Sequence, residues 1–288
     1  MNGITIGFEW LKTNKRTTAL ITTVYALSVI LTHDFVQKIS LSLQKSVGIV
    51  NWNTIFLIIG FLTGIVLFLL AYRRISAHEY SFMMWMYAAM LTIIVMLGFS
   101  WLMVKYVESI HFAQYAVLAC LLVALFGRTI PAVLVAVFVG MIDELFQFLY
   151  LYKGMGYYDM NDVVLNCIGS VTGMYLVSVV LGAPGSGIDP LRWKILTRRV
   201  LGSWVILFSL LASLFATGVL GVFADTGRLS FYKNRTEEQG LPERRIRTTR
   251  VGNDWYRLLP PEGVSILFFL PLLFSGLDRQ SRLENKND

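Results

Sequence analysis

The sequence has few residues of the kinds that build disulfide frameworks, metal clusters or soluble surfaces. Its 288 residues include two cysteines, three histidines and only 15% charged residues. Cys120 and Cys167 both lie inside apolar runs, so we expect them to pack as small hydrophobic side chains and not to form a disulfide framework. His33, His78 and His111 are too scattered along the sequence to show a metal-ligand spacing. The sequence therefore predicts no metal and no cofactor.

The shortage of charge comes with an excess of apolar residues. The chain is 56% hydrophobic and its mean hydropathy is +0.62, which excludes an ordinary soluble globular domain. A net charge of +7 can indicate nucleic-acid binding, but basic residues in a membrane protein more often set topology, so we expect no nucleic-acid partner. The first apolar run lacks a small-residue cleavage site after it, so we expect a spanning helix there and no signal peptide.

Several apolar runs approach the ~20 residues that a membrane-spanning helix needs. The runs are 17–36, 53–72, 82–104, 111–127, 130–150, 161–181, 200–222 and 263–277. The last of them is short and is interrupted by Pro271. The sequence predicts an all-α fold, a polytopic transmembrane helix bundle with seven or eight spanning helices.

We divide the chain into five segments by composition. They are an amphipathic cytoplasmic lead (1–16), a transmembrane bundle (17–182), a basic inner loop with the seventh helix (183–222), a basic and aromatic outer loop (223–262), and a doubtful eighth helix with a polar tail (263–288). With the N-terminus cytoplasmic, the short outer loops carry only Lys38, Lys45, Lys105 and Lys153, whereas most other Lys and Arg lie on inner segments. This bias favours that orientation.

The outer loop 223–262 mixes arginines with aromatic residues. The alternating run 244–251 is typical of an exposed strand with one basic face. The segment is either a solvated connection or a patch for anionic lipid headgroups, cell-wall polymers or a partner subunit. The residues of the predicted headgroup or partner loop are Lys153, Arg244, Arg245, Arg247, Arg250 and Trp255.

Polar residues concentrate in the stretch Ile142 to Gly173, inside the apolar part of the chain. Side chains three or four residues apart share a helix face, so Gln147 can join Asp143 or Glu144, and Asp162 can join Asn166. Glu108, His111 and Tyr115 form a third stripe. Ionisable residues at membrane depth usually face a polar interior. We expect one pocket, open to the outer face, lined by His111, Tyr115, Asp143, Glu144, Gln147, Asp162 and Asn166.

Three kinds of chemistry suit such a pocket. Carboxylates beside a histidine offer acid–base catalysis, oxygen ligands for a hard cation with a phosphate headgroup, or an ion path. The alternative is a hydrogen-bond network that only holds helices together. Two glycine pairs, Gly60 with Gly64 and Gly169 with Gly173, have the spacing that permits close helix packing.

Two segments, 108–122 and 143–173, resemble the VanZ-like family. The resemblance rests on a His-Phe-x-x-Tyr helix start, an Asp-Glu-x-x-Gln helix end and an Asp-x-x-x-Asn-x-x-Gly-x-x-x-Gly helix, and it covers about residues 50–182. The chain departs from the family pattern in two places: Glu108-Ser109 replaces an Asp-Lys pair, and Lys153 stands where the loop often has an arginine. Lysine cannot reproduce the bidentate contacts of arginine.

The resemblance implies a multi-pass protein of the bacterial inner membrane, in a family associated with glycopeptide (teicoplanin) resistance. It leads us to expect an outward-facing pocket that binds or modifies a lipid or cell-wall precursor headgroup. The competing hypothesis is a non-catalytic accessory or scaffold subunit of a larger membrane complex, or a homo-oligomer, that docks through residues 183–288. The sequence does not decide whether the protein is an enzyme.

Overall fold

The computed structural model describes residues 3–75, 81–103, 108–151, 158–180, 258 and 260–275, with Ser209, Ser213 and four short strands. The helices are α1 (Gly3–Thr13), α2 (Lys15–Leu31), α3 (His33–Val47), α4 (Ile49–Ile75), α5 (Ser81–Trp101), α6 (Ser109–Phe126), α7 (Thr129–Phe146), η2 (Gln147–Leu151), α8 (Met160–Val180) and α10 (Pro260–Leu273). The strands are β1 (Phe223–Asp225), β2 (Arg228–Ser230), β3 (Arg245–Arg247) and β4 (Asp254–Tyr256). The described fold is therefore helical apart from two small hairpins.

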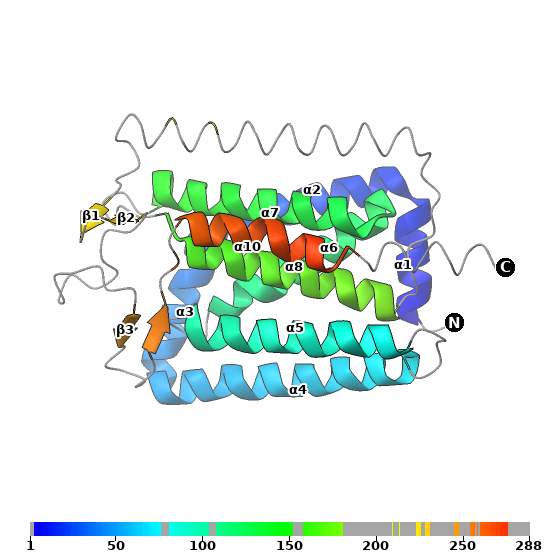
Figure 1. The fold of residues 1–288 in the computed structure, drawn as a ribbon, viewed down its shortest axis with the longest axis horizontal. Coiled ribbons are helices and arrows are strands. Elements are labelled where there is room, and N and C mark those ends of the chain that lie inside the picture. The colour runs from blue at the N-terminus through cyan, green and yellow to red at the C-terminus, as the bar shows by residue number, and fades with distance from the viewer. Residues whose placement is uncertain are drawn as a thin grey trace.

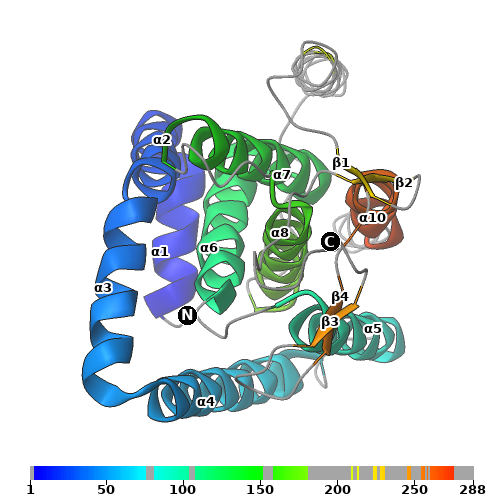
Figure 2. The ribbon, with the colours of Figure 1, turned by 90° about the vertical axis from the view of Figure 1, so that its left-hand side faces the viewer.

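The long helices run side by side, and two shorter helices cross the ends of the bundle. In Figure 1, α4, α5, α7, α8 and α10 lie along the long axis, while α1 and α3 stand across opposite ends. The end-on view in Figure 2 shows α8 inside a ring formed by the other helices. In the most hydrophobic stretch of α8, 89% of the residues are buried, whereas in that of α4 only 6% are buried. The central position of α8 decides where its polar residues can lie.

Five of the described helices are long and apolar enough to cross a membrane, namely α4 to α8. The predicted run 17–36 is not one helix: it breaks into α2 and α3, which bend by 57° at Thr32. If this pair forms one span, the number is six. The run 200–222 lies outside the described residues apart from Ser209 and Ser213, so seven or eight spans stays a prediction.

The outer surface of the bundle is apolar. Large hydrophobic side chains are exposed along α4, such as Phe61 and Phe68, and along α2 and α5, such as Leu20 and Met96. A contiguous apolar surface of this kind marks contact with lipid or another protein. The described structure is thus that of a multi-pass helical membrane protein.

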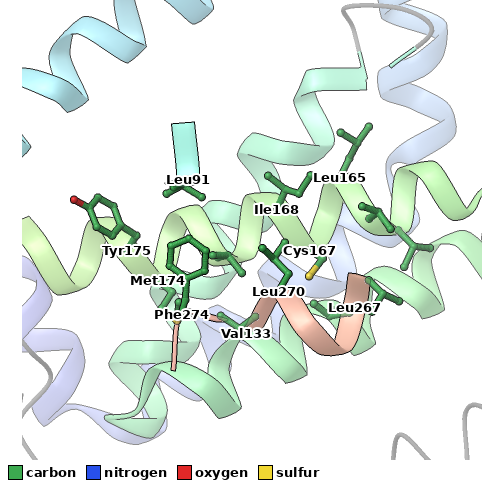
Figure 3. Close-up of a cluster of buried hydrophobic side chains, with 14 of the residues drawn as sticks. Leu91, Val133, Leu165, Cys167, Ile168, Met174, Tyr175, Leu267, Leu270 and Phe274 are labelled. Carbon is green, nitrogen blue, oxygen red and sulfur yellow. The ribbon is translucent and has the colours of Figure 1, made fainter. Parts of the chain in front are cut away.

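The apolar run near the C-terminus folds as the short helix α10. It has 14 residues, fewer than a straight span needs, and it includes Pro271. Leu267, Leu270 and Phe274 are buried against the core around α8, and Figure 3 shows them facing Cys167, Met174 and Val133. The inner face of α10 is therefore part of the bundle.

The two hairpins belong to the predicted outer loop. Antiparallel β1 pairs with β2, and β3 pairs with β4 with Ile246 opposite Trp255. The strand predicted in the alternating run 244–251 is confirmed in its first half, Arg245–Arg247. Figures 1 and 2 both place β4 near α5, at the end of the bundle where α3 lies.

Candidate functional site

A tight turn sets the register between α6 and α7. Gly127 ends α6 with a φ of 66°, a left-handed conformation that favours glycine, and its N–H bonds to the Val123 carbonyl. Because α7 begins two residues later, the two helices are antiparallel neighbours. His111 lies sixteen residues before Gly127 and Asp143 sixteen residues after it, so the turn brings them to the same level.

Glycines on α8 allow this helix to approach α6 closely. A Cβ on Gly169 would lie 2.3 Å from the Phe112 carbonyl oxygen, and one on Gly173 would lie 2.1 Å from that of Ala116. The predicted packing role of this glycine pair agrees with these positions. The other pair differs, since a Cβ on Gly60 or Gly64 meets nothing within 4 Å.

The three polar stripes meet where α6, α7 and α8 pack. The Tyr115 hydroxyl donates to Asp143 Oδ2 at 3.2 Å, and Gln147 Nε2 donates to Glu144 Oε1 at 2.9 Å. Asn166 of α8 packs against Gly140 of α7. A Cβ added at Gly140 would lie 3.1 Å from Asn166 Nδ2 and 3.3 Å from Tyr115 Cε1. We call His111, Tyr115, Asp143, Glu144, Gln147 and Asn166 the polar cluster.

Every member of the polar cluster is buried. His111 is 8% exposed, and Asp143 and Asn166 are 0% exposed. Within the part of the chain that the structure describes, four buried atoms of these residues lack a hydrogen-bond partner: His111 Nδ1, Asp143 Oδ1, and Asn166 Oδ1 and Nδ2. Buried polar atoms are nearly always partnered. Four orphan atoms at one helix junction therefore indicate a place for a ligand, water or ion.

The polar cluster differs from the predicted pocket in access. The sequence predicts an opening to the outer face, but these side chains are buried, and the loop 152–157, with Lys153, lies outside the described residues. Asp162 is only half-buried and interacts electrostatically with Glu108, Glu144 and Asp143. It borders the polar cluster on the side where α8 begins.

His33 is a neighbour that the sequence did not reveal. Its ring centroid lies 5.0 Å from that of His111. One ligand atom from each of His33, His111 and Asp143 can be chosen so that all three lie within 4.8 Å of one another. His33 and His111 are far apart in the sequence, but the break at Thr32 brings the start of α3 to the start of α6. The absence of a metal stays a prediction.

Two residues beside the polar cluster were also missed, and both hold helix ends together. Asn161 Nδ2 donates to the Leu102 carbonyl at 3.0 Å, and Asn161 Oδ1 accepts from the Leu258 N–H at 3.0 Å. Tyr158 donates to the Met141 carbonyl at 3.3 Å, and burial raises the pKa of its phenol, so it stays a neutral donor. An Asn-Asp pair at a helix start is the only sequence signal for Asn161.

The predicted headgroup or partner loop is described only in part. Arg245 and Arg247 lie on β3, and Trp255 lies on β4 opposite Ile246, whereas Arg244 and Arg250 lie outside the described residues.

The polar cluster supplies carboxylates, an imidazole, a phenol and a free amide in a water-poor site. This set can accept hydrogen bonds from a ligand and bind a cation. The Ser170 hydroxyl donates to the backbone carbonyl of Asn166 at 2.8 Å. Comparison of the chain with protein-family models, with characterised proteins and with solved structures finds no match.

Proposed function

We propose that this chain is a VanZ-like protein of the bacterial inner membrane that binds a lipid or cell-wall precursor headgroup in the polar cluster. The observation that carries the proposal is the set of four orphan polar atoms on His111, Asp143 and Asn166. An unpartnered polar group costs most in a low-dielectric interior, so a ligand that satisfies these atoms gains the full benefit of pairing.

The hydrogen-bonding groups favour one class of headgroup. The carboxyl groups of Asp143, Glu144, Asp162 and Glu108 lie around the junction and supply oxygen atoms that can accept hydrogen bonds. Asp143 Oδ1 and Asn166 Oδ1 are both acceptors. A headgroup rich in donors, such as the ammonium of an aminolipid or the hydroxyl and amide groups of a sugar precursor, fits this set better than an anionic one.

The family resemblance supports the same location. The three sequence pieces that carry it supply all six members of the polar cluster and the two glycines that pack α8 on α6. Residues that are far apart in the sequence thus form one site. Glu108, where this chain departs from the family pattern, interacts electrostatically with Asp162 at the border of the site.

Charge also supports an outward-facing site. The basic residues Lys12, Arg16, Arg73 and Arg128 lie at the end of the bundle with α1 and the α6–α7 turn, opposite the polar cluster. Lys15 at this end donates to the carbonyls of Ala124 and Leu125 at 2.7 and 2.8 Å. By the positive-inside bias this end is cytoplasmic, and the buried polar cluster then lies on the side of the outer leaflet.

Native mass spectrometry of the protein extracted gently from its own membrane tests the headgroup proposal. We expect one lipid class to remain bound to the wild type and to be lost in Asn166→Ala and Glu144→Ala. Thr172→Val is the matched control, because Thr172 lies on α8 and its hydroxyl already bonds to the Ile168 carbonyl. Equal retention of the same lipid in Asn166→Ala and in the control contradicts the proposal.

A second candidate, a scaffold subunit, is favoured by the outer face of α10. Phe269 is 71% exposed and Leu272 is 60% exposed, while the inner face is used by the bundle. Deleting α10 would damage the core. The double variant Phe269→Ser with Leu272→Ser is the better test, because it changes only the exposed face of α10. Loss of co-purifying protein, with the bound lipid kept, would favour the scaffold over the headgroup site.

A further inference from the structure

We propose that His33, His111 and Asp143 form a binding site for one divalent transition-metal ion. The three residues come from three helices, α3, α6 and α7, and one ligand atom from each lies within 4.8 Å of the other two. This inference goes beyond the proposed headgroup function, since it needs no lipid and includes His33, which the headgroup site does not use.

The distances suit a site that tightens when the ion binds. Metal–nitrogen and metal–oxygen bonds of about 2.0–2.2 Å place tetrahedral ligand atoms roughly 3.4 Å apart. The groups therefore have to close by at most about 1.4 Å. His33 is the first residue of α3 and is half-buried, at the bend that follows Thr32, so it is the ligand with the most room to adjust.

Two of the three proposed ligands have a buried polar atom that a metal ion could bind. His111 Nδ1 and Asp143 Oδ1 are both buried and have no hydrogen-bond partner among the described residues. Asp143 and His111 are respectively 0% and 8% exposed, so bulk water does not satisfy them. A cation that bridges the two would satisfy both atoms at once, and the tilted ring of His33 lies beside them.

The Asp143 carboxylate also accepts a hydrogen bond from a neighbouring side chain, as metal-binding carboxylates usually do. Tyr115 donates its hydroxyl to Asp143 Oδ2 at 3.2 Å, and Asp143 Oδ1 has no hydrogen-bond partner among the described residues. Such outer hydrogen bonds orient metal ligands and tune their affinity. Tyr115 is fully buried and so is held in place.

The ligand types select the metal. Two imidazoles with one carboxylate suit Zn²⁺, Fe²⁺, Co²⁺ or Mn²⁺ and not Ca²⁺ or Mg²⁺, which prefer oxygen ligands. Three protein ligands leave a coordination position open for water or another small ligand, as in catalytic metal sites and unlike closed structural ones.

Titration of the full-length, chelator-treated protein in detergent with Co²⁺ alone tests the proposal, and Zn²⁺ displacement of the Co²⁺ follows. We expect one equivalent of Co²⁺ with visible absorption bands of a four- or five-coordinate site. His33→Ala should weaken binding more than about 100-fold, and Tyr115→Phe, which removes only the outer hydrogen bond, about 10- to 100-fold. His33→Cys should restore binding and add a thiolate-to-cobalt charge-transfer band.

Asp34→Asn is the matched control. Asp34 follows His33 on α3, but it forms an ion pair with Lys38 at 2.5 Å and is not one of the three ligands. Equal weakening in Asp34→Asn and His33→Ala, or no stoichiometric Co²⁺ or Zn²⁺ in the wild type, overturns the proposal. Because no lipid is added, and because Asn166 is not a metal ligand, failure here leaves the lipid retention of Asn166→Ala as a separate result.

Discussion

At the scale of single residues, Asn166 buries a whole amide between α6, α7 and α8, and neither its Oδ1 nor its Nδ2 has a described partner. A residue that serves ligand binding often lowers the stability of the ligand-free protein. Asn166→Leu keeps the shape and removes the polar atoms. We expect the free energy of unfolding in lipid-free detergent to rise by about 1–3 kcal/mol.

Reversible unfolding followed by far-ultraviolet circular dichroism measures this change, with Thr172→Val as the reference. A fall in stability for Asn166→Leu would mean that the amide is already satisfied in the empty protein. The polar cluster would then be a hydrogen-bond network that holds the three helices together, which is the alternative that the sequence left open.

Asn161 is the opposite case, since both of its polar atoms are used. It joins the end of α5 and the start of α8 to a residue two positions before α10, through Leu102 and Leu258. Asn161→Leu leaves a carbonyl and an N–H unpaired at a buried site, so we expect a loss of about 2–4 kcal/mol in unfolding free energy. Asn51→Ala is the control, because Asn51 is exposed and bonds only to Val47. Equal stability of the two variants would contradict this role.

The sequence predicted some of these residues for a physical reason. Helical spacing alone places Asp143 with Gln147 and Asp162 with Asn166, because positions within one helix depend on local geometry. His33 could not be predicted in the same way. Its contact with His111 spans 78 positions of sequence and depends on a bend between two helices, which no local pattern in the chain measures.

At the scale of elements, that bend is the clearest departure from expectation. The run 17–36 was expected to form one helix, yet α2 ends at Leu31 and α3 begins at His33. The hydroxyl of Ser28 bonds back to the Tyr25 carbonyl at 2.7 Å, and that of Thr32 to the Ser28 carbonyl at 2.6 Å. Such back-bonding weakens and bends helices. The polar start of α3 then lies across the end of the bundle (Figure 1).

The close approach of α8 to α6 gives a prediction for whole helices. Gly173→Ala places a methyl group against the Ala116 carbonyl, so the helices have to separate, and we expect a loss of about 1–3 kcal/mol. Gly64→Ala on α4 has the same chemistry in open space and should instead gain about 0.5–1 kcal/mol. Unfolding of both variants in the same detergent measures the difference, and equal effects would show that this packing is not needed.

At the scale of the whole molecule, the arrangement of charge predicts how the protein sits in its membrane. The end with α1 carries Lys12, Lys15 and Arg16, whereas α3 at the other end carries Lys38 and Lys45, of which Lys38 is paired with Asp34. The lipid-facing sides between them are apolar. The helices that could span were predictable from composition, because hydrophobic length is a local property. The direction in which these helices cross the membrane depends instead on the difference in basic residues between the α1 end and the α3 end of the bundle.

Single cysteines at the two ends test this direction in intact cells. In a background with Cys120→Ala and Cys167→Ala, Ser46→Cys reports the end with α3 and Thr13→Cys the end with α1, and both positions are exposed. A membrane-impermeant maleimide should label Ser46→Cys and leave Thr13→Cys unlabelled until the membrane is opened, because the basic end is held in the cytoplasm. The reverse pattern would turn the polar cluster toward the cytoplasm. A headgroup exposed only on the outer leaflet could then not reach His111 and Asn166, so the choice of ligand would have to change with the topology.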